Sequence, residues 1–322
     1  METKMKSLAE IMADVAEQRD VLEEIHAIRQ EVRGYSTESV EARGLSAEPL
    51  RLMLAASPAR KTFALLAQGD SWFDYAPGTD LVDCLSNLGH RITNLAVAGS
   101  TLNDEAYGPV PKGLFGIPQS KDPDRIAELV NRIVLDKPQG LLLSAGGNDI
   151  AGDEFFSFIN NARSGLQPIN QGVLDGVVND TFKTAYRYLI DIALGAARHV
   201  NIAMPIFVHG YDYPWPDGRG VVHFLGWKIG PWFDETFNHK NFPNTSPAQL
   251  QVRHDITVKF IDALNSMLMG LASEPAYAGK VFHTDLRGTL LSENEWANEL
   301  HPKNPGFRAC AAKIDATLQA HL

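Results

Sequence analysis

The chain has 322 residues, of which 44% are hydrophobic and 21% charged, and its formal net charge at pH 7 is -10. This length is enough for one large α/β domain or two small ones with a substantial core. The acidic balance and the lack of clustered Lys and Arg argue against a broad surface for nucleic acid or anionic membrane, because phosphate binding needs such clusters.

Residues 1–30 carry charges every few positions and no continuous apolar stretch, so they do not read as a secretory signal. No run of about 18 apolar residues that could span a membrane occurs in the sequence. The two cysteines, Cys84 and Cys310, lack metal-ligand spacing, and we interpret both as buried free thiols, with a single bridge as the alternative. The simplest interpretation is a soluble cytoplasmic protein.

Apolar residues recur at helical spacing near the N-terminus and predict one amphipathic helix of about thirty residues that ends near Gly34. The stripe consists of Met5, Leu8, Ile11, Met12, Val15, Leu22, Ile25 and Ile28. A mixed segment, 37–57, follows it. We therefore treat 1–60 as a helical extension and 61–322 as the main domain. Packing on the core is the default role of the extension; pairing of subunits in a homo-oligomer or covering of an active site are the alternatives.

From Lys61 onward, apolar strand patterns alternate with helical patterns. The expected strands are 63–68, 92–98, 140–144, 200–208 and 281–284. The expected helices are 80–88, 123–135, 174–198, 247–271 and 306–322. This alternation predicts an α/β fold with a doubly wound parallel sheet between two layers of helices.

The segment 209–245 is rich in proline, glycine and aromatic residues. Its aromatic residues are Tyr211, Tyr213, Trp215, Phe224, Trp227, Trp232, Phe233, Phe237 and Phe242. A loop of this length is usually functional or disordered, and this aromatic content is too high for disorder. We expect an ordered insertion beside the ligand-binding edge of the sheet, forming either a substrate wall or a satellite hydrophobic cluster.

Chemistry-bearing residues follow four of the expected strands. Ser71, after the first strand, is a candidate nucleophile because ligands bind at the carboxyl edge of such sheets. Gly99, after the second strand, lets the backbone approach a ligand with its N–H, and Asn148, after the third, carries an amide that can donate to an oxyanion. His301, near the C-terminus, can act as the general base. Together these residues supply the roles that acyl transfer requires.

The blocks 69–71, 94–99, 146–149 and 301–302 resemble, in order and spacing, the four signature blocks of the SGNH/GDSL hydrolase family. The resemblance implies a three-layer α/β/α sandwich of flavodoxin-like type, with five strands in the order 2-1-3-4-5. It also implies hydrolysis of an acyl ester, as in esterases and lipase-like enzymes, through an acyl-enzyme on Ser71. In that scheme His301 is the base, and the Ser71 N–H, the Gly99 N–H and the Asn148 side chain form the oxyanion hole.

Two residues depart from the family pattern. Trp72 follows the serine where the family has leucine, which is a tolerated change. More important, Asn298 stands where the family has the aspartate of its Asp-x-x-His block. An amide can accept a hydrogen bond from the imidazole N–H but cannot stabilise imidazolium as a carboxylate does.

Three explanations compete for this departure. Ser71 and His301 work as a pair oriented by Asn298 or by a backbone carbonyl. Alternatively, another carboxylate takes the role, with Asp285 the best placed and Glu295 or Glu299 next. In the third, the site only binds. Two further acids, Asp70 and Asp149, are expected to brace turns rather than to react.

No ligand spacing for a metal and no phosphate-cradling glycine loop appears, so we expect no metal and no cofactor. The expected partner is a small acyl ester. The preferred function is an esterase; an acyltransferase on the same fold and a binding protein that retains the scaffold are the alternatives.

Overall fold

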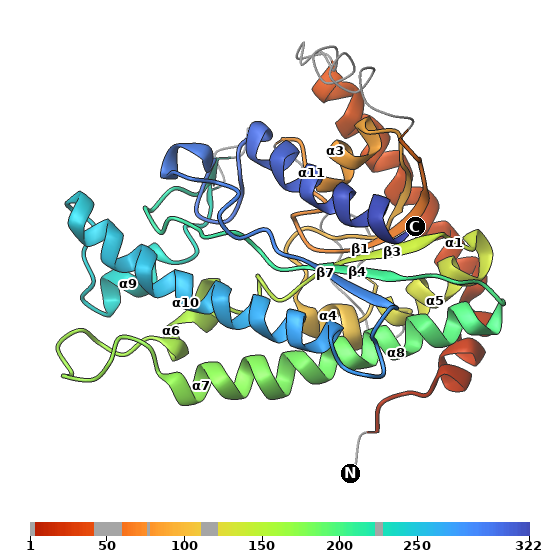
Figure 1. The fold of residues 1–322 in the computed structure, drawn as a ribbon, viewed down its shortest axis with the longest axis horizontal. Coiled ribbons are helices and arrows are strands. Elements are labelled where there is room, and N and C mark those ends of the chain that lie inside the picture. Colours follow the sequence, from red (N-terminus) through yellow and green to blue (C-terminus); the bar gives the residue numbers. More distant parts are fainter. Residues whose placement is uncertain (1–3, 42–59, 76–77, 111–121, 223–227) are drawn as a thin grey trace.

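The computed structural model describes residues 4–41, 60–75, 78–110, 122–222 and 228–322, and for 32–41 it describes the backbone alone. A five-stranded, all-parallel sheet runs through its centre (Figure 1). The strands are β1 (Ala64–Gly69), β2 (Arg91–Asn94), β3 (Gly140–Ser144), β4 (Ile206–His209) and β7 (Val281–Thr284). Their order, β2-β1-β3-β4-β7, is 2-1-3-4-5 along the chain. The expectation of an α/β fold with a parallel five-stranded sheet is confirmed.

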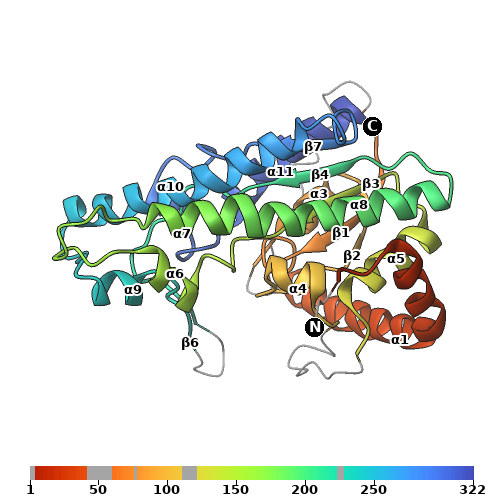
Figure 2. The same ribbon diagram turned by 90° about the horizontal axis from the view of Figure 1, so that it is seen from below.

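Helices cover both faces of the sheet (Figures 1 and 2). On one face lie α3 (Leu81–Asn87) and α11 (Asn304–His321), which pack on each other. On the other lie α4 (Leu102–Tyr107), α5 (Arg125–Asp136), α8 (Lys183–His199) and α10 (Pro247–Ala272). The sheet is therefore buried on both faces, which explains why all five residues of β3 are buried and its sequence is nearly continuous in leucine.

The remaining elements lie at the edges of this sandwich. A turn of π-helix, η2 (Gly176–Phe182), joins α7 (Gln171–Asp175) to α8. The others are α1 (Leu8–Glu41), η1 (Gly152–Glu154), α6 (Phe155–Phe158), the two-stranded hairpin of β5 (Val221–Val222) and β6 (Lys228–Ile229), α9 (Asp234–His239) and η3 (Glu293–Glu295).

Two strands are shorter than the sequence predicts. β2 ends at Asn94 because the Asn94 side chain accepts from the Ala96 N–H at 2.9 Å, which turns the chain out of the sheet. The predicted strand 200–208 begins only at Ile206, since Val200 and Ile202 still donate to carbonyls of α8 and close that helix. The apolar residues of 200–204 were assigned to the strand wrongly.

The N-terminal helix α1 packs along α5 and extends past Gly34, so its predicted end was wrong. Ile11, Val15, Leu22 and Ile25 are buried in the common core, whereas Met5 and Ile28 are 50% and 43% exposed. Most of the mixed segment 37–57 lies outside the described residues.

Both cysteines are free and buried, as expected. In the part of the chain that the structure describes, no helix combines the length and the apolar character needed to cross a bilayer.

Candidate active site

The sheet order reverses between β1 and β3, and the carboxyl ends of strands at such a switch point form a ligand-binding crevice. Ser71 follows β1 there and meets His301, which lies in the loop before α11. The Ser71 Oγ is 2.7 Å from the His301 Nε2, and both residues are buried. The structure therefore joins the predicted nucleophile and the predicted base by a hydrogen bond.

Asn298 holds the other side of the imidazole. Its Oδ1 lies 3.0 Å from the His301 Nδ1 and also accepts from the backbone N–H groups of Leu300 and His301, at 3.0 and 2.9 Å. Its Nδ2 donates to the Tyr75 hydroxyl at 3.0 Å. These partners require the amide oxygen to face the ring, so the His301 proton sits on Nδ1 and Nε2 accepts from Ser71.

Two aromatic rings contact the His301 imidazole. The Tyr75 ring stacks on the imidazole with a centroid distance of 4.2 Å and an interplanar angle of 18°. Trp232 approaches it at 5.9 Å and 69°. Burial lowers the pKa of His301 to about 3, so the ring is neutral at physiological pH.

The alternative acids lie elsewhere. Asp285 forms a bidentate ion pair with Arg287, whose Nε and Nη2 donate to its two carboxylate oxygens at 2.9 and 2.6 Å. This pairing lowers the pKa of Asp285. Glu295 accepts from the Leu291 and Ser292 N–H groups. The structure does not bring these acids to the His301 Nδ1, where Asn298 already lies.

Glu299 is also turned away from the imidazole. Its carboxylate accepts from the backbone N–H groups of Gly218, Trp232 and Phe233 at 3.0, 2.6 and 2.7 Å. Burial raises the pKa of Glu299 to about 7. This acid thus attaches the aromatic segment to the loop that carries the base.

The predicted oxyanion donors lie in loops that contact the nucleophile turn. The Val97 N–H donates to the Gly69 carbonyl at 2.9 Å, and the Asn148 Nδ2 donates to the Ser100 carbonyl at 2.9 Å. Gly99 has a φ of +81°, is exposed, and has open space where a Cβ would be. A ligand can therefore approach its backbone closely.

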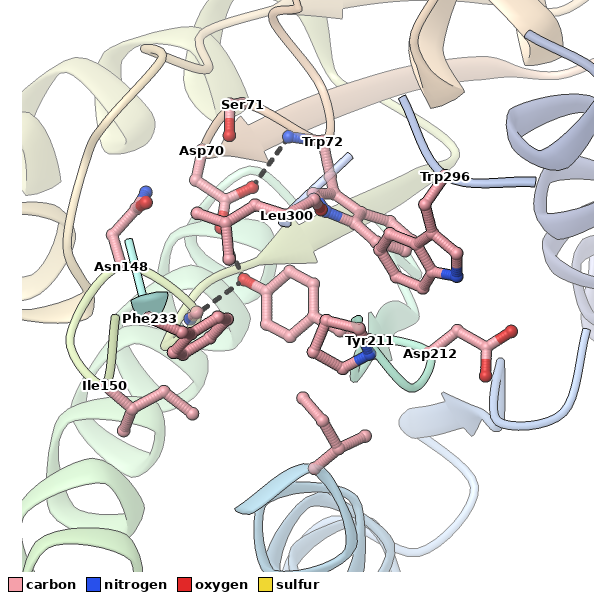
Figure 3. A pocket seen from close by; sticks show the side chains of 13 residues that line it. Asp70, Ser71, Trp72, Asn148, Ile150, Tyr211, Asp212, Phe233, Trp296 and Leu300 are labelled. Atoms are coloured by element: carbon pink, nitrogen blue, oxygen red, sulfur yellow. Dashed lines mark hydrogen bonds between the residues drawn. The ribbon is translucent and has the colours of Figure 1, made fainter. Parts of the chain in front are cut away.

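Asp70 braces the nucleophile turn, as expected. It accepts from the Trp72 N–H at 2.9 Å and from the Tyr211 hydroxyl (Figure 3). It also accepts from the Ser144 Oγ at 3.0 Å. Burial raises the pKa of Asp70 to about 6.

Tyr211 also reaches the turn after β3. Its hydroxyl accepts from the Gly147 N–H at 3.1 Å, and a Cβ at Gly147 would lie only 2.8 Å from the Tyr211 ring. Glycine is therefore required there. Tyr211 connects the turn that carries Ser71 with the turn that carries Asn148.

Asp149 accepts from the Leu102 N–H at 2.7 Å and the Asn103 N–H at 3.4 Å, and so braces a turn as expected. Nearby, Glu105 is fully buried 3.7 Å from Arg125, which donates to the Ser100 Oγ at 2.6 Å. Burial raises the pKa of Asp149 to about 6 and that of Glu105 to about 7.

A cavity of about 30 Å³ adjoins Ser71 and Asn148 (Figure 3). Its apolar walls are formed by Ile150, Pro214, Phe233, Ile261, Trp296 and Leu300, with the Tyr211 ring. Trp72 borders it but is buried, with its Nε1 donating to the Leu300 carbonyl at 3.0 Å, and Phe73 is fully buried. Phe73 therefore belongs to the core.

The aromatic segment divides into two parts. Tyr211, Trp232 and Phe233 reach the site, whereas Phe237 and Phe242 are buried in the core, where Phe237 packs on Phe155. Phe233 belongs to both parts, because its ring also packs on Phe155 at 4.9 Å. Trp215 stacks on His254 at 3.9 Å, Tyr213 donates to Asp262, and His223, Phe224 and Trp227 lie outside the described residues.

The sequence did not reveal Tyr75, Tyr211, Glu105 or Arg125 as parts of the site. Tyr75 lies 223 residues from Asn298, and Tyr211 lies 141 residues from Asp70. Tyr211 belonged to a segment singled out for its aromatic content, but nothing in that pattern assigns it a partner. Among the described residues, no group of three or more His, Cys, Asp and Glu could hold a metal ion.

Comparison with known proteins gives only a distant likeness. No known family description and no curated protein matches the chain. Solved structures that match it over most of its length include esterases and lipases. One is a carbohydrate esterase family 3 protein from Talaromyces cellulolyticus, with 13% identity over 79% of this chain and 95% of that one, and a TM-score of 0.40.

Two further matching structures are lipases. Lip_vut3 from a goat rumen metagenome has 13% identity over 80% of this chain and 97% of its own, with a TM-score of 0.45. An extracellular lipase from Streptomyces rimosus has 14% identity over 80% and 99%, with a TM-score of 0.44. At these identities and TM-scores the likeness assigns no function.

Proposed function

We propose that the protein is an SGNH-type serine hydrolase that cleaves carboxylic acyl esters through an acyl-enzyme on Ser71. The observation that carries the proposal is the chain of hydrogen bonds from the Ser71 Oγ to the His301 Nε2, at 2.7 Å, and from the His301 Nδ1 to the Asn298 Oδ1, at 3.0 Å. A base within hydrogen-bond reach of a hydroxyl, and itself oriented by a third group, is the arrangement that activates serine.

The reaction follows from this geometry. The Ser71 Oγ attacks the acyl carbon as its proton passes to the His301 Nε2. The tetrahedral intermediate collapses, the bond from carbon to the alcohol oxygen breaks, and His301 returns the proton to the departing alcohol. Water then attacks the acyl-enzyme, with His301 taking its proton and giving it back to the Ser71 Oγ, and the acid is released.

We assign the oxyanion hole to the Ser71 N–H, the Gly99 N–H and the Asn148 side chain. An amide nitrogen has two hydrogens, and Asn148 gives one to the Ser100 carbonyl. The second is left for the oxyanion, and the Ser100 contact fixes the direction in which it points. Donors fixed in advance lower the barrier because they need no reorganisation as charge develops.

The cavity beside Ser71 supports a preference for short acyl groups. Its volume of about 30 Å³ and its apolar walls match one or two carbons rather than a long chain. We further propose that residues 61–322 form the hydrolase domain, with 209–245 as an insertion, and that 1–60 is an extension that supports it.

The test is hydrolysis of p-nitrophenyl acetate, butyrate and octanoate, together with labelling by a fluorophosphonate. Wild type is expected to turn over acetate fastest and to be labelled, and Ser71→Ala is expected to lose at least about 10³-fold in turnover and all labelling. Ser164→Ala, which removes an exposed serine, is the control and should match wild type. Equal turnover by wild type and Ser71→Ala, or no labelling of wild type, would contradict the proposal.

A further inference from the structure

Tyr75 contacts both His301, the proposed base, and Asn298, the residue that orients it. Its ring covers one face of the His301 imidazole at 4.2 Å and 18°, and its hydroxyl accepts from the Asn298 Nδ2 at 3.0 Å. It is half-buried and comes four residues after Ser71, and its backbone N–H donates to the buried Asp80 at 3.2 Å. One side chain thus touches the base and the residue that orients it.

In the part of the chain that the structure describes, no charged side chain is in hydrogen-bond or ring contact with His301. Its partners of these two kinds are Ser71, Asn298, Tyr75 and Trp232, all of them neutral. Yet the proposed reaction makes imidazolium twice, at acylation and at deacylation. A serine hydrolase with a carboxylate at the third position stabilises that charge and orients the ring with one group. Here the two tasks must be met by other means.

We propose that Tyr75 is a positioning residue that, together with Asn298, replaces the missing carboxylate. This inference rests on the proposed function. The hydroxyl holds the Asn298 amide with its oxygen toward the His301 Nδ1, and the electron-rich face of the ring stabilises the imidazolium that forms in the transition state.

The two contributions differ in size. The Asn298 oxygen is already held by the Leu300 and His301 N–H groups, so the Tyr75 hydroxyl adds one anchor among three. Loss of one neutral hydrogen bond corresponds to a few-fold change in rate. The stacked ring acts on the charged form directly and is therefore expected to contribute more.

The test is a double-mutant cycle that combines Tyr75→Phe and Tyr75→Leu with Asn298→Asp. In the wild-type background we expect kcat to fall about 3- to 10-fold for Tyr75→Phe and about 30- to 100-fold for Tyr75→Leu, with KM within about twofold. In the Asn298→Asp background the cost of Tyr75→Leu should shrink to about threefold or less, because a carboxylate now orients the ring and stabilises its charge.

Two controls separate this role from general loss of tyrosines. Tyr213→Phe removes a hydroxyl that donates to Asp262, and Tyr107→Leu removes an exposed ring stacked on Tyr188 at 5.6 Å. Both should keep wild-type kcat. Thermal denaturation of each variant shows whether it folds. If Tyr75→Leu does not fold, Tyr75→Phe still tests the role of the hydroxyl.

Equal losses in the two backgrounds would overturn the inference, because the Tyr75 ring would then do nothing for His301 that a carboxylate can replace. Full kcat in Tyr75→Leu would do the same. The rate of fluorophosphonate labelling of Ser71 gives a readout that does not depend on the ester chosen. If wild type shows neither turnover nor labelling, the proposed function fails and this inference with it. If both are present and the cycle is additive, only the inference on Tyr75 is wrong.

Discussion

Two groups of polar side chains lie at the same edge of the sheet and differ in charge. The described hydrogen-bond and ring partners of His301 are all neutral, and the Asn298 amide lies next to its Nδ1. Behind Ser71, by contrast, the carboxyl groups of Asp70 and Glu105 are buried and that of Asp149 is partly buried. Asp70 and Asp149 support turns of the site, whereas the described partners of its base are neutral.

The number of donors alone does not account for the difference. Asp70 gathers three N–H or O–H donors and Asp149 two. The Asn298 Oδ1 likewise has three, the Leu300 and His301 backbone N–H groups and the His301 Nδ1. A buried carboxylate must also offset the loss of water around its charge, whereas a neutral amide oxygen accepts the same bonds without that cost.

Removal of the carboxylate that braces Ser71 is expected to have the largest effect. Asp70→Asn replaces one of two acceptor oxygens by a donor that faces the Ser144, Tyr211 or Trp72 donors. We expect kcat to fall about 100-fold, since a nucleophile displaced by a fraction of an ångström loses its attack geometry. Asp180→Asn, at an exposed position, is the control. Wild-type kcat in Asp70→Asn would show that the charge there is dispensable.

On the neutral side, Asn298→Ala removes the partner of the His301 Nδ1 without adding a charge. We expect a loss of about 10- to 100-fold in kcat, because the ring is then free to change tautomer or to rotate. Steady-state kinetics beside the exposed Asn179→Ala would measure it. A loss below about twofold would mean that packing alone orients the imidazole.

The protonation state of His301 also tests the difference in charge between the two groups of side chains. Burial lowers the pKa of His301 to about 3, so the ring should remain neutral at pH 5, where a histidine of ordinary pKa is about 97% protonated. In Asn298→Asp the pKa should rise by about 1 to 3 units. Imidazole ¹⁵N shifts measured from pH 4 to 8, assigned with His301→Gln, would show both. An unshifted titration near 6.5 in wild type would refute the first expectation.

The smallest expected effect concerns stability on the charged side. Burial raises the pKa of Glu105 to about 7, so the folded state holds a proton that the unfolded chain has already released above its ordinary value of 4.5. Stability is therefore greatest below about pH 4.5 for this group and is lost as the pH rises through 7.

Urea denaturation at pH 5 and pH 8 measures this slope. Glu105→Gln should reduce the loss of stability between the two pH values by about 1 to 2 kcal/mol. The rest of the loss should remain, because the pKa values of Asp70 and Asp149 are also raised in the folded state. An unchanged slope would mean that Glu105 stays ionised beside Arg125 throughout.

The alternation of strand and helix patterns predicted the parallel sheet. The short blocks that follow strands pointed to Ser71, His301 and Asn298, which the structure links by hydrogen bonds. The sequence patterns failed where partners are distant in the chain. Tyr75 and Asn298 lie 223 residues apart, and no local pattern pairs them. The ends of elements failed for a different reason, since backbone donors at Val200 and Ile202 extended a helix into an apolar run that has the composition of a strand.

The segment between β4 and α10 is attached to both halves of the site. Tyr211 holds the nucleophile turn through Asp70, and the backbone of Gly218, Trp232 and Phe233 is held by Glu299, two residues before the base. An engineer who exchanged this segment as a cassette to alter specificity would therefore also disturb the catalytic geometry. New specificities are more readily reached by single substitutions at wall positions such as Ile150 or Ile261, which lie outside the segment and line the same cavity.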